Sequence, residues 1–238
     1  MCKFNDKNLT EFRFSKEDMK AEVITFTATT LDGAAAFISP FTDNMLQHPE
    51  ICGLLIAEID AADNDGKLSH PVVTYEETTK LPFLMACVKE TLRRDAPAQT
   101  IIPRVVSSPG YQLTPNIFIP ASASMGASPY IIHRHVPTFS PSPELFQPSR
   151  WIPGEGIPWA TPKFTQNMER LGVWWDYGDR ECAGKSYAQM QSQKLLVELF
   201  RRFNISGAPP GVERFKHERW AVGMFWEQRL LFQERIPN

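Results

Sequence analysis

The sequence lacks long apolar runs. No stretch approaches the roughly 18 consecutive apolar residues that a membrane-spanning helix requires. Residues 1–6 also lack the charged-then-apolar order of a signal peptide. We therefore expect the chain to carry no membrane anchor or targeting signal of its own.

Closely spaced cysteine pairs are absent as well. Four cysteines occur in 238 residues, and they are widely separated at Cys2, Cys52, Cys87 and Cys182. Without a C-x-x-C pair or a dense cysteine framework, neither a structural zinc site nor a set of disulfides is expected. We expect a reducing compartment.

Charge of one sign is not in excess either. The chain has 25 basic and 27 acidic residues, a formal net charge of -2, and the two signs are interleaved. This distribution leaves no basic footprint for nucleic acid, which is therefore not expected as a partner. With 42% hydrophobic residues, the chain can bury one large core or two small ones.

What the sequence does contain is helical spacing of apolar residues. The stretch 15–47 predicts one long helix, which begins at a capping box of Ser15 and Asp18 and is kinked at Pro40. Further helices are predicted over residues 48–60, 81–94 and 182–203.

Strand signals follow the third of these helices. Residues 100–122 hold short β-prone runs separated by turn residues, which predicts a small sheet. Prolines recur through 137–165, so this segment cannot be helical throughout and is predicted to be an ordered meander packed on the core. A hairpin is predicted over 220–232. The expected fold class is therefore mainly α with small β-sheets.

The segment 175–184 places Cys182 at the mouth of the last predicted helix. Backbone N–H groups and the helix dipole stabilise a thiolate there, and Arg180 adds positive charge. Iron can take such a sulfur as an axial ligand, while Gly178 permits a tight turn and Gly184 a close approach to a flat ring. The alternative is that Cys182 is a small apolar residue that begins a helix.

This loop resembles the F-x-x-G-x-R-x-C-x-G loop of the cytochrome P450 family. The match falls on Gly178, Arg180, Cys182 and Gly184, and Trp175 replaces the usual Phe. The resemblance implies a cytochrome P450 fold of which residues 1–238 form one partial domain, the C-terminal half. It also implies haem b with Cys182 as the ligand to iron, held by a set of cofactor-binding residues: Arg104, Trp175, Tyr177, Gly178, Arg180, Ala183 and Gly184.

Three further residues fit the same resemblance. Glu90 and Arg93 lie three apart on the helix over 81–94 and resemble the family's E-x-x-R pair. Arg150 lies in a segment similar to P-E-R-W, with Ser149 where Glu is common. The resemblance implies a buried network in which two guanidinium groups satisfy one carboxylate. The alternative for the first two is an ordinary solvated helix pair.

The long helix resembles the family's oxygen-activating helix, which carries A-G-x-D/E-T. Asp32 matches the acid that relays protons, but Gly33 stands where the threonine is expected. A positioned acid–alcohol relay is worth about 10²–10⁴ in rate. We therefore expect slower or leakier oxygen chemistry, unless Thr29 and Thr30 hold a water instead. The alternative for Asp32 is a tolerated polar residue, and the alternative for Arg104 is an exposed strand arginine.

The resemblance, closest to filamentous-fungal members, implies a haem-thiolate monooxygenase. It would insert one atom of O2 into a small lipophilic or aromatic substrate, with electrons from NADPH through a reductase. Substrate contacts are expected from residues 98–101 and from the terminal hairpin near Gly223. A complete member would lie on the cytosolic face of the endoplasmic reticulum membrane, whereas this chain would be cytosolic. The alternatives are a truncated, catalytically incomplete fragment with a scaffold or interaction role, and a haem-free binding module.

Overall fold

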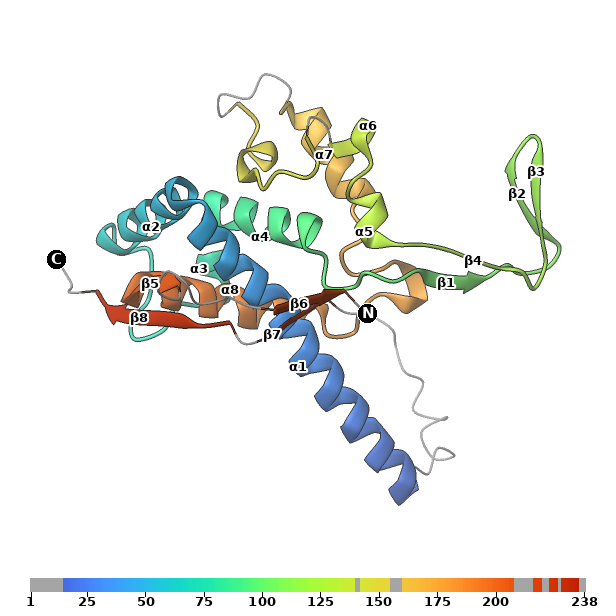
Figure 1. The fold of residues 1–238 in the computed structure, drawn as a ribbon, viewed down its shortest axis with the longest axis horizontal. Helices are drawn as coiled ribbons and strands as arrows, with labels where there is room; N and C mark the ends of the chain where they lie inside the picture. The colour runs from blue at the N-terminus through green and yellow to red at the C-terminus, as the bar shows by residue number, and fades with distance from the viewer. Residues whose placement is uncertain are drawn as a thin grey trace.

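The computed structural model describes residues 15–139, 142–154, 160–207, 216–219, 223–226 and 228–235. In this part of the chain, a group of helices is accompanied by short antiparallel strands, and one β arm extends far from the body (Figure 1). Among the described residues, no helix combines the length and the apolar character needed to cross a membrane. The helices are α1 (Lys16–Gln47), α2 (Pro49–Asn64), α3 (Tyr75–Thr78), α4 (Pro82–Arg94), α5 (Pro129–Ile132), α6 (Val136–Phe139), η2 (Pro148–Trp151), α7 (Pro162–Leu171), η3 (Gly178–Arg180) and α8 (Lys185–Arg202).

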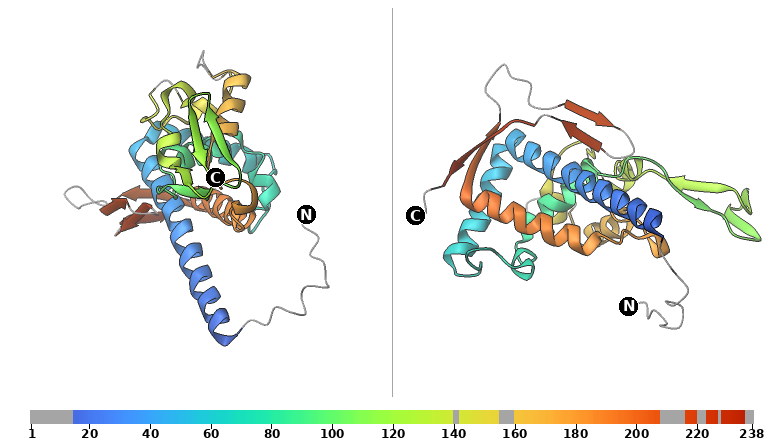
Figure 2. Two further views of the ribbon diagram at one scale, coloured as in Figure 1. Left: turned by 90° about the vertical axis from the view of Figure 1, so that its right-hand side faces the viewer. Right: turned by 90° about the horizontal axis from the view of Figure 1, so that it is seen from below.

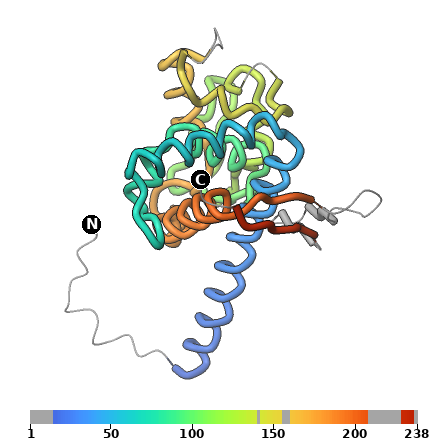
Figure 3. The backbone as a smooth tube through the Cα atoms, turned by 90° about the vertical axis from the view of Figure 1, so that its left-hand side faces the viewer, coloured from blue at the N-terminus to red at the C-terminus, as the bar shows by residue number. Residues whose placement is uncertain are grey.

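Helix α1 begins where its capping box predicts. The Ser15 hydroxyl accepts a hydrogen bond from the Asp18 N–H at 3.0 Å, and the Asp18 carboxylate accepts one from the Ser15 N–H at 2.9 Å. The helix then continues through Pro40 to Gln47. Its N-terminal half projects from the body of the molecule (Figures 1 and 3). Large apolar side chains on this half are therefore exposed, at 52% for Met19, 65% for Val23, 69% for Ile24, 65% for Phe26 and 64% for Leu31.

The hydrophobic core lies where the C-terminal half of α1 meets α2, α4 and α8. Helix α8 runs beside α1 when the molecule is seen from below (Figure 2). Phe41 of α1 is fully buried, and its ring meets that of Phe200 of α8 edge-on, with centroids 6.1 Å apart. Leu55 and Ile59 of α2, Leu84 of α4 and Leu196 of α8 complete the centre of this cluster. In this region the apolar faces of α2, α4, α8 and the C-terminal half of α1 are thus buried against one another.

The strands form four antiparallel pairs among the described residues. β1 (Ile102–Val105) pairs with β4 (Ser124–Ala127), and β2 (Gly110–Thr114) pairs with β3 (Ile117–Pro120). The second pair is the tip of the long arm (Figure 1). The prediction of one sheet over 100–122 is therefore wrong in its extent, because the partner of β1 lies beyond residue 122. The run Ser124–Ala127 contains only one large apolar residue, so its sequence gave little strand signal.

The hairpin predicted over 220–232 is also wrong in its pairing. β7 (Gly223–Trp226) pairs with the preceding β6 (Lys216–Arg219), whereas β8 (Leu230–Glu234) pairs with β5 (Phe203–Gly207). Residues 220–222 and 227 lie outside the described part. A β-prone run does not specify its partner, and here β8 pairs with the strand that directly follows α8, where the Phe203 and Phe232 rings lie 5.8 Å apart.

The proline-rich segment 137–165 is irregular around η2 in its described residues, and Phe139, Phe146 and Trp151 bury their side chains in the core. Its end was predicted incorrectly, because α7 begins at Pro162. Proline is suited to the first helical position, and the Thr161 hydroxyl caps the helix by accepting from the Phe164 N–H at 3.2 Å. Proline there marks the start of a helix rather than a break.

Two helix predictions need smaller corrections, and one short helix was missed. α2 runs on to Asn64, beyond the predicted end at residue 60, and the short α3 had no predicted counterpart. The last helix begins at Lys185 rather than at Cys182, with Gly184 as its N-cap. The physical reason is that the Cys182 N–H donates a hydrogen bond to the Trp175 carbonyl at 2.8 Å, and this bond keeps the cysteine backbone in the loop.

Candidate functional site

The loop between α7 and α8 holds the predicted iron ligand. Its backbone closes on itself through the Cys182-to-Trp175 hydrogen bond and through the Glu181 N–H, which donates to the Gly178 carbonyl at 3.0 Å. Gly178 has a φ of 66°, a left-handed conformation that glycine adopts without strain. Cys182 is exposed on this loop. The fold therefore presents the thiol at the surface instead of burying it as an apolar residue.

Space around the sulfur is open on the side of Gly184. A Cβ placed at Gly184 would meet, within 4 Å, only the Cys182 Sγ at 3.8 Å, and one placed at Gly178 would meet no atom. The neighbouring Ala183 is exposed too. Arg180 is exposed and forms no ion pair within the described part of the chain, whereas Lys185 pairs with Glu181 at 2.6 Å. The loop thus exposes both a thiol and a guanidinium, two residues apart in the sequence.

Two aromatic residues hold the start of the loop. Trp175 is half-buried and packs against the main core. The Tyr177 hydroxyl lies 2.5 Å from the Gly172 carbonyl and 3.1 Å from the Arg170 carbonyl, and this contact ties the loop to the end of α7. Tyr177 therefore has a structural contact in addition to the cofactor contact that the resemblance implies for it.

Arg104 has a partner that sequence reasoning missed. Its guanidinium forms an ion pair with Asp176 of the cysteine loop and also donates to the Pro103 carbonyl at 2.9 Å. The hydrogen bond from Arg104 lowers the pKa of Asp176 below its usual range. Strand β1 and the loop also lie together in Figure 1. The structure thus brings Arg104 beside the cysteine loop, although no motif pointed to the carboxylate that holds it.

Glu90, Arg93 and Arg150 converge in the interior, where all three side chains are fully buried. Arg93 meets the Glu90 carboxylate with two nitrogens, Nε and Nη2, each at 2.9 Å, and Arg150 Nε donates to the same carboxylate at 3.1 Å. Two partners were not foreseen: the Gln147 N–H at 2.8 Å and the Trp151 indole N–H at 2.9 Å. Every one of these groups donates, so the acceptor sites of the buried carboxylate are filled.

Backbone carbonyls accept further guanidinium hydrogens in this network. Arg93 donates to the carbonyls of His133 at 3.0 Å, Pro143 at 2.6 Å and Leu145 at 3.0 Å. Arg150 donates to the Phe139 carbonyl at 2.8 Å. Burial lowers the pKa of Arg150, and the ion pair with Glu90 opposes this. The network therefore connects α4 to the irregular segment around η2 and fixes its path.

His133 joins this network to the cysteine loop. It is fully buried, and its Nε2 accepts a hydrogen bond from the Val173 N–H at 3.0 Å, directly after α7. Burial, followed by the positive charge of Arg93, lowers the pKa of His133 to about 3. The imidazole is therefore neutral near pH 7. Its contacts here are structural, and the described residues contain no cluster of side chains that could hold a metal ion.

Asp32 lies on the exposed half of α1. Within the described residues, no hydrogen bond or ion pair joins it to the cysteine loop. The Thr29 hydroxyl donates to the Thr25 carbonyl at 2.7 Å, so its proton is already engaged by the helix. A Cβ at Gly33 would meet no atom within 4 Å, so a larger side chain fits there. The predicted relay thus consists here of one exposed acid without a neighbouring alcohol at position 33.

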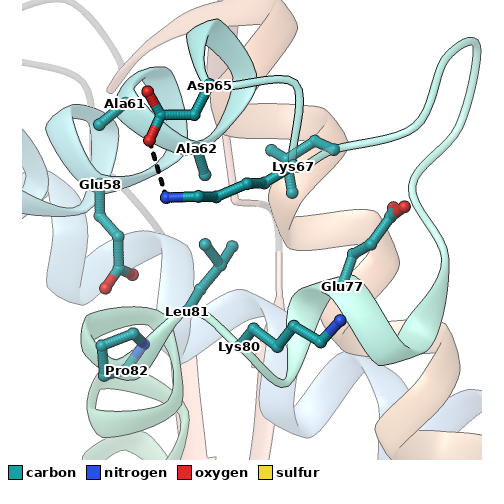
Figure 4. Close-up of a pocket in the computed structure, with 10 residues that line it drawn as sticks. Glu58, Ala61, Ala62, Asp65, Lys67, Glu77, Lys80, Leu81 and Pro82 are labelled. Atoms are coloured by element: carbon teal, nitrogen blue, oxygen red, sulfur yellow. Dashed lines mark hydrogen bonds and ion pairs between the residues drawn. The ribbon is translucent and has the colours of Figure 1, made fainter.

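Two surface hollows lie away from these residues. One, of about 360 Å³, lies between the end of α2, α3 and the start of α4 (Figure 4). There, Lys67 reaches across to Asp65 at 2.7 Å, above the apolar side chain of Leu81. The other, of about 470 Å³, lies along the exposed face of α1 near Met19 and Val23. Neither hollow is lined by a residue predicted for the site, so neither changes the assignment of the cysteine loop.

Comparison with known proteins identifies the class to which this fold and loop belong. The model of the cytochrome P450 family matches residues 2–230. A solved cytochrome P450 (CYP102L1) superposes with a TM-score of 0.74 at 18% identity, covering 96% of this chain and 48% of that one, which shows the fold alone. The chain therefore belongs to the cytochrome P450 family.

Fungal relatives are among the similar sequences, in agreement with the resemblance seen in the sequence. A cytochrome P450 monooxygenase of Aspergillus flavus is 30% identical over 201 residues, covering 84% of this chain and 37% of the relative. The cytochrome P450 monooxygenase cicH of Emericella nidulans is 29% identical over 191 residues, covering 80% of this chain and 37% of the relative. The chain thus spans little more than a third of the length of these curated relatives.

The family implies a haem group, and the residues of the loop fit one. Cys182 is exposed, its surroundings at Gly178 and Gly184 are open, and Arg180 is available to a carboxylate. A thiolate ligand and a cation nearby are the donor set that a haem with two propionates requires. Arg104 is the residue that departs from this fit, because Asp176 already binds it.

Proposed function

We propose that this chain forms the haem-thiolate part of a cytochrome P450 monooxygenase. The observation that carries the proposal is the exposed Cys182 in a closed loop that matches the family pattern, with Arg180 exposed two residues before it. Bound haem b would activate O2 for insertion of one oxygen atom into a small lipophilic or aromatic substrate. Electrons would come from NADPH through a reductase. The complete enzyme would lie on the cytosolic face of the endoplasmic reticulum membrane.

Each predicted residue has a defined part in this proposal. Cys182 would bind the haem iron as a thiolate, and Arg180 and Arg104 would bind the propionates. Asp32 would move protons to the reacting face, and Trp175 would cover the sulfur. Four residues would shape the surface against which the haem lies: Tyr177, Gly178, Ala183 and Gly184. Glu90, Arg93 and Arg150 would act only through the scaffold, since all three are buried within their own network.

A second candidate function rests on the exposed half of α1. Phe26 and Leu31 present their side chains to solvent at 65% and 64%, and the chain covers 37% of the Aspergillus flavus relative. Exposed apolar surface of this kind is typical of an interaction site. The alternative is therefore a catalytically incomplete fragment that retains the scaffold and serves an interaction role.

Haem uptake by the purified chain distinguishes these functions. We expect the chain titrated with haem b, then reduced under carbon monoxide, to show the red-shifted Soret band of a thiolate complex. Cys182→Ser should abolish that band, whereas Cys52→Ser, a matched thiol on α2, should leave it unchanged. Failure to retain haem while far-UV circular dichroism shows an intact fold would support the scaffold role, or a haem-free binding module.

A further inference from the structure

We propose that Asp176 competes with a haem propionate for Arg104 and so weakens haem binding by this chain. The inference rests on the proposed function, because it concerns the same site. Its basis is the ion pair between a strand residue and a loop residue 72 positions apart in the sequence. A carboxylate of the protein thus occupies the guanidinium that the haem carboxylate would need.

The contacts of Arg104 leave its terminal nitrogens engaged. Nη2 donates to the Asp176 carboxylate, and Nη1 donates to the Pro103 carbonyl at 2.9 Å. The side chain of Arg104 is nevertheless 40% exposed, so a ligand can reach it. A propionate that binds Arg104 must therefore share the guanidinium with Asp176 or displace it.

Asp176 is built to hold its position. Its φ of 63° is in the left-handed region that aspartate and asparagine tolerate better than most residues. Its second carboxylate oxygen accepts a hydrogen bond from the Tyr177 N–H at 2.8 Å. The depressed pKa keeps the group ionised at neutral pH. The carboxylate is thus a fixed negative charge beside the cation, and a propionate that approaches would meet repulsion from it.

The charge effect can be removed without changing the backbone. Asparagine accepts the same left-handed conformation and has nearly the same shape, so Asp176→Asn removes the charge and leaves the turn. Because the pair is partly exposed, screening limits the effect. We expect the dissociation constant for haem b to fall by roughly threefold to tenfold. The rate of haem transfer to excess apomyoglobin should fall in parallel.

The matched control is Asp179→Asn, which removes one charge from the same loop at an exposed residue that forms no ion pair within the described residues. This variant should change haem affinity less than Asp176→Asn does. Arg104→Gln should weaken haem binding, and in that background Asp176→Asn should have a smaller effect than in the unaltered chain, because the competition for Arg104 is gone and only the charge repulsion remains. Circular dichroism of each haem-free variant checks that the fold is retained, and Asp176→Gly, which adopts the left-handed conformation without strain, serves as a second variant if Asp176→Asn fails to fold.

Two different failures can be told apart. If the unaltered chain takes up no haem, the proposed function fails and this inference fails with it. If the unaltered chain binds haem and Asp176→Asn binds it equally or more weakly, the proposed function stands and the inference is overturned. Weaker binding would show instead that Asp176 orients Arg104 toward the cofactor.

Discussion

Replacing Glu90 with glutamine tests the buried network most directly. The substitution keeps the shape of the side chain but removes its charge and converts one acceptor into an NH2 donor. If the amide nitrogen takes the place of Oε2, it faces the N–H groups of Arg93 and Trp151. If it takes the place of Oε1, it faces Arg93, Arg150 and the Gln147 N–H instead. Either orientation places donors against donors.

The expected cost follows from burial. Arg93 and Arg150 are fully buried, so Glu90→Gln leaves two guanidinium cations in the interior without an opposing charge. Removing one partner of a buried ion pair typically costs about 3–5 kcal/mol. A single domain is stable by only about 5–15 kcal/mol in total. We therefore expect Glu90→Gln to lower the free energy of unfolding by about 3–5 kcal/mol, which is a large share of the total.

Chemical denaturation followed by circular dichroism measures this loss, since it reports the free energy of unfolding without need of the cofactor. The matched control is Glu144→Gln, which also breaks an arginine pair, that of Arg134, but at a side chain that is 69% exposed. It should cost less than about 1 kcal/mol. A loss below about 1 kcal/mol for Glu90→Gln would refute the reasoning, because the network would then not be acting as a buried ion cluster.

Two further predictions concern acid stability and oxygen chemistry. The pKa of His133 is about 3 in the folded chain against an ordinary value near 6.5, so only the unfolded chain binds this proton between these values. The free energy of unfolding should therefore fall as the pH falls below about 6.5, by up to about 1.4 kcal/mol per pH unit. Denaturation measured across this pH range should show that His133→Gln loses this part of the pH dependence, whereas His135→Gln keeps it. A Cβ at Gly33 meets no atom within 4 Å. If the proposed function holds, Gly33→Thr should therefore lower the hydrogen peroxide released per NADPH consumed, relative to Gly33→Ala, when the haem-loaded chain is assayed with a reductase. An unchanged peroxide yield would exclude a missing alcohol as the cause of leakage.

The features that the sequence predicted well are those set by local chemistry. The start of α1 follows from the capping box of Ser15 and Asp18, and α4 begins at Pro82, where a missing N–H costs nothing. The E-x-x-R spacing placed Glu90 and Arg93 on one face, and in the structure both are buried together. Such signals depend on residues within one or two helical turns, which a single sequence displays directly.

The features that the sequence missed depend on distant partners. The hydrogen bond from Trp151 to Glu90 joins residues 61 positions apart, and Arg104 meets Asp176 across 72. Strand β4 was missed because its pairing with β1, and not its composition, makes it a strand. The start of α8 was misplaced because the Cys182 N–H bonds to Trp175. No periodicity or turn rule encodes contacts of this kind.

The long sequence separation within the Glu90 network also affects the order of folding. Glu90 and Arg93 can meet as soon as α4 forms, whereas Gln147, Arg150 and Trp151 must close a loop of about sixty residues before they reach the carboxylate. The entropy of closing such a loop is lost before any of its hydrogen bonds form. The carboxylate that anchors the finished core should therefore remain hydrated until late, and the docking of the η2 segment should be among the last steps in assembling the native state.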